Sequence, residues 1–318
     1  MLGQAILLSI ASGIAAALLS GVLTPGSMLS ALLSFVAPLP LMIAGLGWHP
    51  LVAALGALVG CLLMDIALSS KAALYFGLLI GLPSYLICEM TLRLPVMADT
   101  GEAIGTGRRT GGFIFGAIGG YAVLVTLIGA LSIDMSFDGF QARLATAVES
   151  LFRSMFESGP GRLPQGFDIV AMSKVYAYIM PAMLTMLVCA MLTVSLWLAQ
   201  KVVARSGRLP FPPFPAYLIA LPREVMFVFI GALLVSRLGG YLGLFASLVL
   251  VAASFAFLMA GLSLLHFRTL GRKDRPFLIW AGWIAVTIFV LPTFLFAIAG
   301  GLDSVFDFRR PKGGSSNA

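Results

Sequence analysis

Four ionisable side chains interrupt an otherwise apolar stretch of the sequence, "CLLMDIALSSKAALYFGLLIGLPSYLICEMTLR", at residues 61–93. They belong to Asp65, Lys71, Glu89 and Arg93. An ionisable group deep inside a bilayer is costly, and by default it marks a binding site or an ion or proton pathway. The same group near a helix end can reach the membrane surface and needs no function. The chemistry of this stretch therefore depends on where its helices begin and end.

The composition indicates that these helices cross a membrane. The 318 residues are 60% hydrophobic and 10% charged, whereas soluble domains are about 45–50% apolar and about 25% charged. Apolar runs of about 20 residues, long enough to cross a bilayer as helices, recur along the chain. They lack the in-and-out alternation of barrel strands. The sequence therefore predicts an all-α polytopic transmembrane bundle in the lipid bilayer, with residues 1–318 as a single integral membrane domain.

Apolar runs and the residues that break them predict about eight to nine spanning helices. The expected spans lie near residues 4–23, 28–47, 50–69, 72–96, 111–133, 174–200, 223–237, 241–266 and 277–300. The first span is expected to be retained, because no basic region precedes it as in a cleaved signal peptide. The span at 223–237 is the weakest, and its alternative is a re-entrant half-helix.

The basic residues predict the orientation of the bundle. A count of nine spans places three basic loops on one side of the membrane, with Arg93, Arg108, Arg109, Lys201, Arg205, Arg208, Arg223, Arg268, Arg272, Lys273 and Arg275. The positive-inside rule makes that side cytoplasmic, with the N-terminus inside. A disordered tail at 309–318 then falls outside with Arg309, Arg310 and Lys312. Either the tail is an exception to the rule or the count is off by one.

The polar region between the spans at 111–133 and 174–200 contains one amphipathic helix, expected at 138–156. Its apolar residues recur at helical spacing and are Phe140, Leu144, Val148, Leu151, Met155 and Phe156. Polar side chains occupy the opposite face. We expect this helix to lie on the outer membrane surface or to cap the mouth of the bundle. The alternative is a lid over a binding site.

Two prolines are candidates for lining a substrate-binding site. Pro38 and Pro40, in "VAPLPLM", remove backbone donors and are expected to kink or break their helix. Broken membrane helices often line binding sites, because the freed carbonyl groups need other partners. The alternative is a simple kink without a ligand.

Two acids are the other candidates for substrate binding. Asp65 and Glu89 lie further inside their expected spans than any other acid of the chain. Asp65 is expected to meet Lys71 across a turn, and Glu89 precedes Arg93 by four residues, the favourable order for an ion pair on one helix. Both acids can therefore also be ordinary helix-end charges.

The motifs of known catalytic and metal sites are absent from the sequence. It has no Gly-rich phosphate loop, no GxSxG and no HExxH motif, and no nucleic-acid-binding motif. Cys61, Cys88 and Cys189 lack partners at metal-ligand spacing and are expected to be small buried hydrophobic residues. We therefore expect no enzyme, no cofactor, no metal and no nucleic-acid partner. A weaker alternative is carboxylate chemistry on a lipid, which Asp65→Asn or Glu89→Gln would abolish.

Several segments together resemble one family. They are "APLPLMIAGLGWHPLVAALGALVG", "GLLIGLPSYLICEMTLR", "WLAQKVVARSGRL", "RPFLIWAGWIAV" and "LDSVFDFRR", and they resemble the alphaproteobacterial branch of the DUF2232 family of bacterial inner-membrane proteins. More distantly, that family is similar to the substrate-binding (S) components of energy-coupling-factor transporters, which dock an ATPase-driven module through small residues of their first helix. The resemblance implies a place in the bacterial inner membrane, and Ala11 and Ala15 as contacts with a membrane coupling subunit and its ATPase.

Two functions from different classes follow from these features. The first is a small-molecule transport or substrate-binding membrane component, with a pocket near the broken helix and under the amphipathic helix and with an unidentified ligand. The second is a non-enzymatic scaffold that assists envelope assembly through its small-residue helix faces. Ligand binding by the purified protein would favour the first function. A stable membrane partner without a ligand would favour the second.

Overall fold

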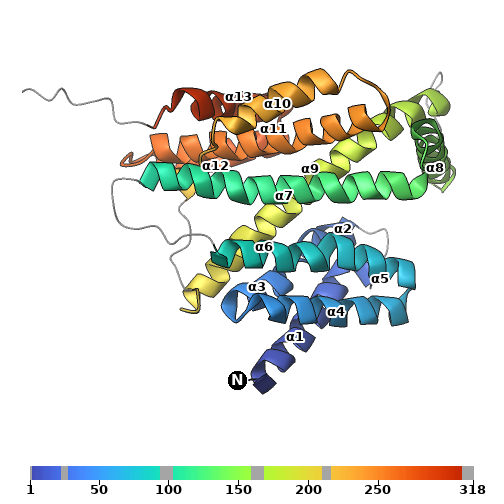
Figure 1. The fold of residues 1–318 in the computed structure, drawn as a ribbon, viewed down its shortest axis with the longest axis horizontal. Helices are drawn as coiled ribbons and strands as arrows, with labels where there is room; N and C mark the ends of the chain where they lie inside the picture. The colour runs from blue at the N-terminus through green and yellow to red at the C-terminus, as the bar shows by residue number, and fades with distance from the viewer. Residues whose placement is uncertain (1, 23–27, 94–102, 159–167, 210–215, 310–318) are drawn as a thin grey trace, which may run out of the picture.

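The computed structural model describes residues 2–22, 28–93, 103–158, 168–209 and 216–309 (Figure 1). No strand occurs in these ranges, and the predicted all-α bundle is confirmed. The first helices are α1 (Leu2–Ala17), α2 (Met28–Phe35), α3 (Leu39–Gly47), α4 (Pro50–Ala67), α5 (Ser70–Phe76), α6 (Leu82–Arg93) and α7 (Ala103–Ile133). They are followed by α8 (Phe137–Ser158), α9 (Ile169–Arg205), α10 (Glu224–Val235), α11 (Gly240–Arg268), α12 (Arg275–Ile288) and α13 (Val290–Phe306).

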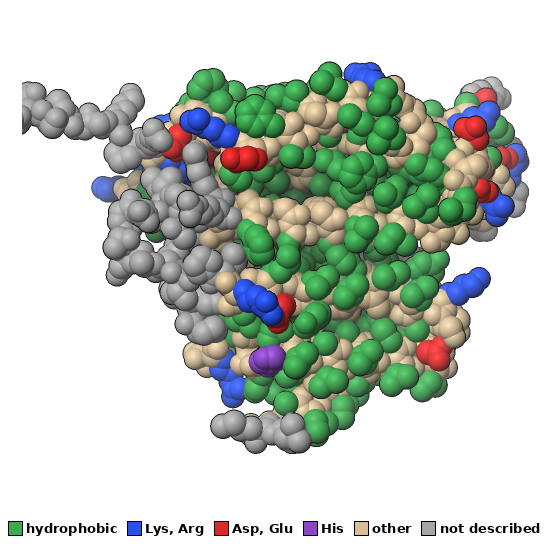
Figure 2. All heavy atoms as spheres, viewed as in Figure 1, with side chains coloured by type: hydrophobic (Ala, Val, Ile, Leu, Met, Phe, Trp, Pro, Cys, Tyr) green, Lys and Arg blue, Asp and Glu red, His purple; other side chains and the backbone are tan. Residues whose placement is uncertain are grey.

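Six helical segments in the described ranges are long and apolar enough to cross a membrane. They are Gly3–Ser20, Pro50–Ala67, Ser70–Arg93, Thr110–Ile133, Ile169–Arg205 and Gly240–Arg268. Apolar side chains cover the middle of the face shown in Figure 2, and most charged side chains on that face lie toward its two ends. This distribution suits a bundle whose middle contacts lipid and whose ends contact water.

The predicted count of eight to nine spans is higher than these six for three reasons. The expected span at 28–47 is divided between α2 and α3. Helix α10 has 12 residues, about 18 Å of helix, which is shorter than the hydrocarbon core of about 30 Å. Helices α12 and α13 meet at a bend of 117°, so the expected span at 277–300 is not one straight helix.

Helix α1 packs closely along α4 because small residues lie at their contact. A Cβ added at Gly13 would overlap the carbonyl oxygen of Gly56. Ser12 approaches Gly56, and the Ser20 hydroxyl donates to the Met64 sulfur at 3.6 Å, so α1 runs in the same direction as α4. Residues with little or no side chain permit this approach between membrane helices.

Helix α9 connects the two halves of the molecule. It is 37 residues long and crosses the bundle obliquely between α1–α6 and the group formed by α7 and α10–α13 (Figure 1). Buried residues of α9, such as Cys189 and Leu192, share one hydrophobic cluster with residues from both halves. The hydroxyl groups of Thr185 and Thr126 lie 3.1 Å apart and join α9 to α7. The main core is therefore built around α9.

The closest backbone approach in the C-terminal half joins α11 and α13. A Cβ added at Gly261 would overlap the carbonyl oxygen of Phe296, and one added at Gly300 would overlap that of Phe257. The two backbones touch without an intervening side chain. Only very small residues at the interface permit so close an approach. Helix α13 is thereby fixed against the C-terminal half of α11.

The α12–α13 pair begins and ends near the same end of α11. Arg275, the first residue of α12, follows the end of α11 after a short turn. Past the other end of the pair, the Arg268 Nη2 of α11 donates to the carbonyl oxygen of Phe308 at 3.3 Å. The pair therefore forms a bent hairpin whose two ends lie near the same end of α11. The expected span at 277–300 thus consists of two helices bent by 117° and not of one straight helix.

The predicted amphipathic helix at 138–156 is present as α8, which lies across one end of the bundle (Figure 1). Phe140 is buried, and its ring packs beside Tyr241 of α11, whereas Leu151 and Met155 remain exposed. At the start of α8 the carboxylate of Asp134 accepts from the backbone N–H of Ser136 at 2.9 Å. That bond, the hydroxyl of the same serine and the nearby Arg143 lower the pKa of Asp134. Helix α8 therefore caps this end of the bundle.

We predict that Gly261→Ala destabilises the protein, because the new methyl group has no space against the α13 backbone. Overpacking of a rigid contact typically costs about 1–3 kcal/mol. Thermal unfolding in detergent, followed by tryptophan fluorescence, measures the loss. Gly129→Ala is the matched control, because a Cβ at that glycine of α7 meets nothing within 4 Å. Equal unfolding temperatures for the two variants would contradict the close contact.

We predict that the 268–275 loop and the C-terminal residues face the same side of the membrane. Single cysteines at Lys273 and Ser315, in a protein whose native cysteines are replaced, test this with an impermeant thiol reagent. Both positions are expected to react from the same side of oriented vesicles, because the α12–α13 hairpin returns to its starting side. Reaction from opposite sides would show that the pair crosses the bilayer.

Candidate binding groove

The acid predicted near Lys71 has a different partner. Asp65 lies exposed near the end of α4, and its Oδ1 accepts from the Ser70 hydroxyl at 2.6 Å. No ion pair between Asp65 and Lys71 forms in the described part of the chain. The hydroxyl is closer because Ser70 opens α5 directly after the turn. Asp65 therefore interacts within its own helix–turn–helix connection.

Glu89 forms the ion pair that its spacing predicts. The Arg93 Nε donates to the Glu89 Oε1 at 2.7 Å within the last turns of α6. The arginine is exposed and the glutamate is partly buried, which is the arrangement of a helix-end pair at a membrane surface. Glu89 lies away from the groove described below.

The two prolines break the helix at the expected position. Helix α2 ends at Phe35 and α3 begins at Leu39, with Pro38 preceding α3 and Pro40 in its first turn. The carbonyl oxygens freed by the break accept tight-turn bonds, such as Ala37 N–H to Ser34 at 3.2 Å. Local bonds thus satisfy backbone groups that a bilayer would otherwise leave unpaired.

An open groove of about 520 Å³ lies elsewhere, between α7, α10 and α11. Helices α7 and α10 each pack against α11, which forms the floor between them. A hollow is visible between α10 and α7 in the view of Figure 2. Its lining comprises Gly112, Phe115, Gly116, Gly119, Gly120, Val123, Leu124, Leu127, Leu221, Glu224, Val225, Val228, Phe245, Val249, Ala252, Ala253 and Ala256. Cavities of this size typically hold small molecules.

Glycines of α7 determine the width of the groove. A Cβ added at Gly119 would lie 3.1 Å from the Cβ of Ala252, so this glycine packs α7 against α11. A Cβ added at Gly116 or Gly120 would meet nothing within 4 Å. These two glycines therefore leave open space where any other residue would place a side chain.

A short segment at residues 216–223, which we call the strap, closes one end of the groove. A Cβ added at Gly111 would lie 2.5 Å from the carbonyl oxygen of Ala220, and one at Gly112 would lie 2.6 Å from Pro222. Leu221 is buried and lines the groove. The strap therefore rests directly on the first glycines of the α7 wall. Residues 210–215, which precede the strap, lie outside the described residues.

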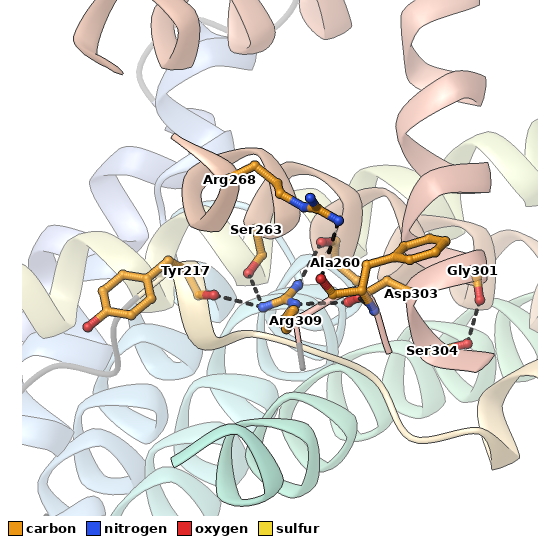
Figure 3. Close-up of polar contacts among 9 residues, drawn as sticks. Tyr217, Ala260, Ser263, Arg268, Gly301, Asp303, Ser304 and Arg309 are labelled. Atoms are coloured by element: carbon orange, nitrogen blue, oxygen red, sulfur yellow. Dashed lines mark hydrogen bonds and ion pairs between the residues drawn. The ribbon is translucent and has the colours of Figure 1, made fainter. Parts of the chain in front are cut away.

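A buried arginine, Arg309, hydrogen-bonds to the backbone of the strap (Figure 3). The Arg309 Nε contacts the Asp303 Oδ2 at 2.9 Å, and both side chains are 0% exposed. The Nη1 of Arg309 donates to the Tyr217 carbonyl oxygen at 2.7 Å and to the Ser263 hydroxyl at 3.2 Å. Its Nη2 donates to the Ala260 carbonyl oxygen at 3.2 Å. One guanidinium group therefore joins the strap, α11 and α13.

The prediction for Arg309 is corrected by this cluster. The sequence placed Arg309 in a disordered tail, whereas its side chain is fully buried against Asp303. The remaining tail residues, 310–318, lie outside the described residues. The signal in the sequence was Asp303, an acid in an apolar segment six residues before an arginine. A buried acid needs a nearby counter-charge or hydrogen-bond donors, and Arg309 supplies both to Asp303.

The small residues proposed for a partner contact lie on α1, away from the groove. Ala11 is exposed and Ala15 is partly buried. Exposed apolar residues Leu7 and Ile14 flank them on the same outer face. The structure leaves this face uncovered by the described residues.

These features define a multi-pass helical membrane protein with a lateral apolar groove. The chain belongs to the family described as predicted membrane protein (DUF2232), whose family model matches residues 13–304. The search of curated proteins found no match, and the search of solved structures found none. The family that the sequence segments resemble is thereby confirmed.

We predict that Arg309→Met and Asp303→Asn each destabilise the protein by about 3–5 kcal/mol, because each leaves a buried polar partner without its counter-charge. Combining Arg309→Met with Asp303→Leu should recover part of that loss, since an apolar pair needs no counter-charge. Thermal unfolding in detergent measures all three variants.

The matched control for this prediction is Arg272→Met, which removes an exposed ion pair with Asp274 of 2.9 Å. Exposed pairs contribute little to stability, so its unfolding temperature should equal that of the unmodified protein. An Arg309→Met protein as stable as the control would contradict the anchoring role of the buried cluster.

Proposed function

We propose that this protein is a membrane component that binds an apolar small molecule in the groove between α7, α10 and α11, as the substrate-binding part of a transport process. The observation that supports this most is the groove itself, which is open, about 520 Å³ in volume and almost wholly apolar. Such a lining favours a hydrocarbon ligand over a polar metabolite, because a polar ligand would lose its hydration without gaining hydrogen bonds.

The location of the groove supports access from the bilayer. Its walls belong to helices that are long and apolar enough to cross a membrane, α7 and α11. Its α7 wall includes the exposed glycines Gly116 and Gly120. In this proposal a ligand dissolved in the hydrocarbon region enters sideways between α7 and α10. No passage through water is then needed.

The same proposal includes an orientation in the bacterial inner membrane. Basic residues gather at one end of the bundle. The guanidinium carbon of Arg208, just after α9, lies 4.1 Å from the centre of the Trp48 ring, just before α4. Arg268, at the end of α11, donates to the Phe308 carbonyl oxygen. The N-terminus of α1 belongs to this end because α1 runs parallel to α4. By the positive-inside rule this end is cytoplasmic, together with the strap and both termini.

The proposed role is binding and not catalysis. Among the described residues, Glu224 is the one ionisable side chain that lines the groove, whereas acid–base or nucleophilic chemistry generally needs at least two cooperating groups. The exposed face of α1 around Ala11 would serve as the contact with a coupling subunit and its ATPase. Transport against a gradient would need such an energy source, whereas a scaffold would use the same face without any ligand.

We predict that Gly120→Leu strongly weakens ligand binding without unfolding the protein, because the leucine side chain fills open space in the groove. Vesicles containing the protein and a diazirine-labelled palmitic acid are irradiated, and labelled peptides are identified by mass spectrometry. Labelling of α7, α10 and α11 should fall by about tenfold or more, which corresponds to about 1.4 kcal/mol of binding free energy.

Gly129→Leu is the control for this experiment. Gly129 also lies on α7 with open space around it, but it does not line the groove. Both variants add the same apolar volume to the same helix, so only the groove distinguishes them. Equal labelling of the two variants would overturn the proposed site. A stable membrane partner together with no groove labelling in the unmodified protein would favour the scaffold function.

A further inference from the structure

The groove is chemically uneven along its length. From Phe115 to Leu127 its α7 wall consists of apolar side chains and glycines. Glu224, whose side chain is exposed, lines the opposite wall at the end nearest the strap, where α10 begins. No ion pair of Glu224 forms within the described residues. A molecule that filled the groove would therefore meet hydrocarbon along most of its length and one negative charge at its end.

A positive charge accompanies Glu224 at this end. Arg223 stands directly before Glu224, and the residues on either side of this pair, Pro222 and Val225, pack on the α7 wall and line the groove respectively. The arginine side chain is exposed. Arg223 does not itself line the groove, but as the exposed neighbour of Glu224 it places a positive charge beside this end of the groove.

The size of the groove selects between an acyl chain and a helix. The lining residues of α7 extend from Gly112 to Leu127, which is about 22 Å of helix at about 1.5 Å per residue. A partner helix of about 10 Å diameter over that length would need roughly 1,700 Å³. The groove offers about 520 Å³. A single hydrocarbon chain can lie within this space, whereas a helix about 10 Å across would project from it into the bilayer.

We propose that the groove holds one acyl chain of a bilayer phospholipid whose headgroup contains both a phosphate and a free ammonium group, as phosphatidylethanolamine does. The Glu224 carboxylate faces the ammonium group, and the Arg223 guanidinium faces the phosphate. A carboxylate at this position disfavours headgroups that carry the phosphate alone, because their net negative charge is uncompensated. This inference rests on the proposed function, since it names the ligand of the same groove.

The preference arises at the membrane surface, and its size is correspondingly modest. Exposed ion pairs are screened by water and salt, so the headgroup adds selectivity while the acyl chain supplies most of the affinity. Removing the carboxylate should therefore change which lipid is retained more than how much lipid is retained. The choice of headgroup and the binding of the acyl chain in the groove can therefore be tested separately.

The test is native mass spectrometry of the full-length protein, purified in detergent and incubated with equal amounts of phosphatidylethanolamine and phosphatidylglycerol that carry the same acyl chains. The unmodified protein should retain the ethanolamine lipid about two- to fivefold more than the glycerol lipid. Glu224→Gln should bring this ratio close to one and leave total lipid retention nearly unchanged. Glu89→Gln removes a glutamate paired with Arg93 away from the groove, and its ratio should stay that of the unmodified protein.

The outcomes separate the two proposals. Loss of all retained lipid in Gly120→Leu, together with an unchanged preference in Glu224→Gln, would support the groove and overturn the headgroup assignment. Equal retention of both lipids by the unmodified protein would overturn it as well. Retention that Gly120→Leu leaves unaffected would place the lipid outside the groove, and both the headgroup assignment and the proposed function would then be wrong.

Discussion

The buried contact between Arg309 and Asp303 is the constraint on which the C-terminal half depends. Water is excluded from both side chains, so each charge must be satisfied by the other and by nearby polar groups. Carbonyl oxygens accept from Arg309, and the backbone N–H of Phe308 donates to the Asp303 carboxylate. The arginine reaches three segments that are far apart in the sequence, the strap, α11 and α13. Because the strap leads directly into α10, the position of one wall of the groove follows from this contact (Figure 3).

The groove exists because its three helices make different contacts. Helix α11 packs tightly against α13 through glycines on both sides, and against α7 through Gly119. Helix α10 contacts α11, but it stands apart from the α7 face that carries Gly116 and Gly120. A space bounded in this way stays open to lipid, because no side chain of the described residues fills it. Leu221 of the strap closes one end of that space, and Glu224 is the one ionisable residue of an otherwise apolar lining among the described residues.

The sequence predicted what local patterns determine and missed what tertiary contacts determine. Composition and the length of the apolar runs are sufficient to predict an all-α membrane bundle. The helical spacing of Phe140 and Val148 is sufficient to predict α8, and the spacing of Glu89 and Arg93 is sufficient to predict their ion pair.

The return of α13 to its starting side could not be predicted, since hydropathy is the same for a crossing helix and for a bent re-entrant pair. Arg309 was misplaced for a related reason: its partners Tyr217 and Ala260 are distant in sequence. The glycines at 112, 116 and 120 were visible as small residues, but only the structure separates those that pack from those that leave space.

The measurement that tests this account most directly is a cryo-electron microscopy map of the protein in nanodiscs made from bacterial phospholipid. The account predicts a continuous tubular density along Gly116 and Gly120 that ends in a headgroup beside Glu224, with the strap held by Arg309. A map in which α7 and α10 close upon each other and leave no space for a chain would contradict it. So would an open groove that contains no ordered lipid density while lipid is resolved elsewhere on the surface.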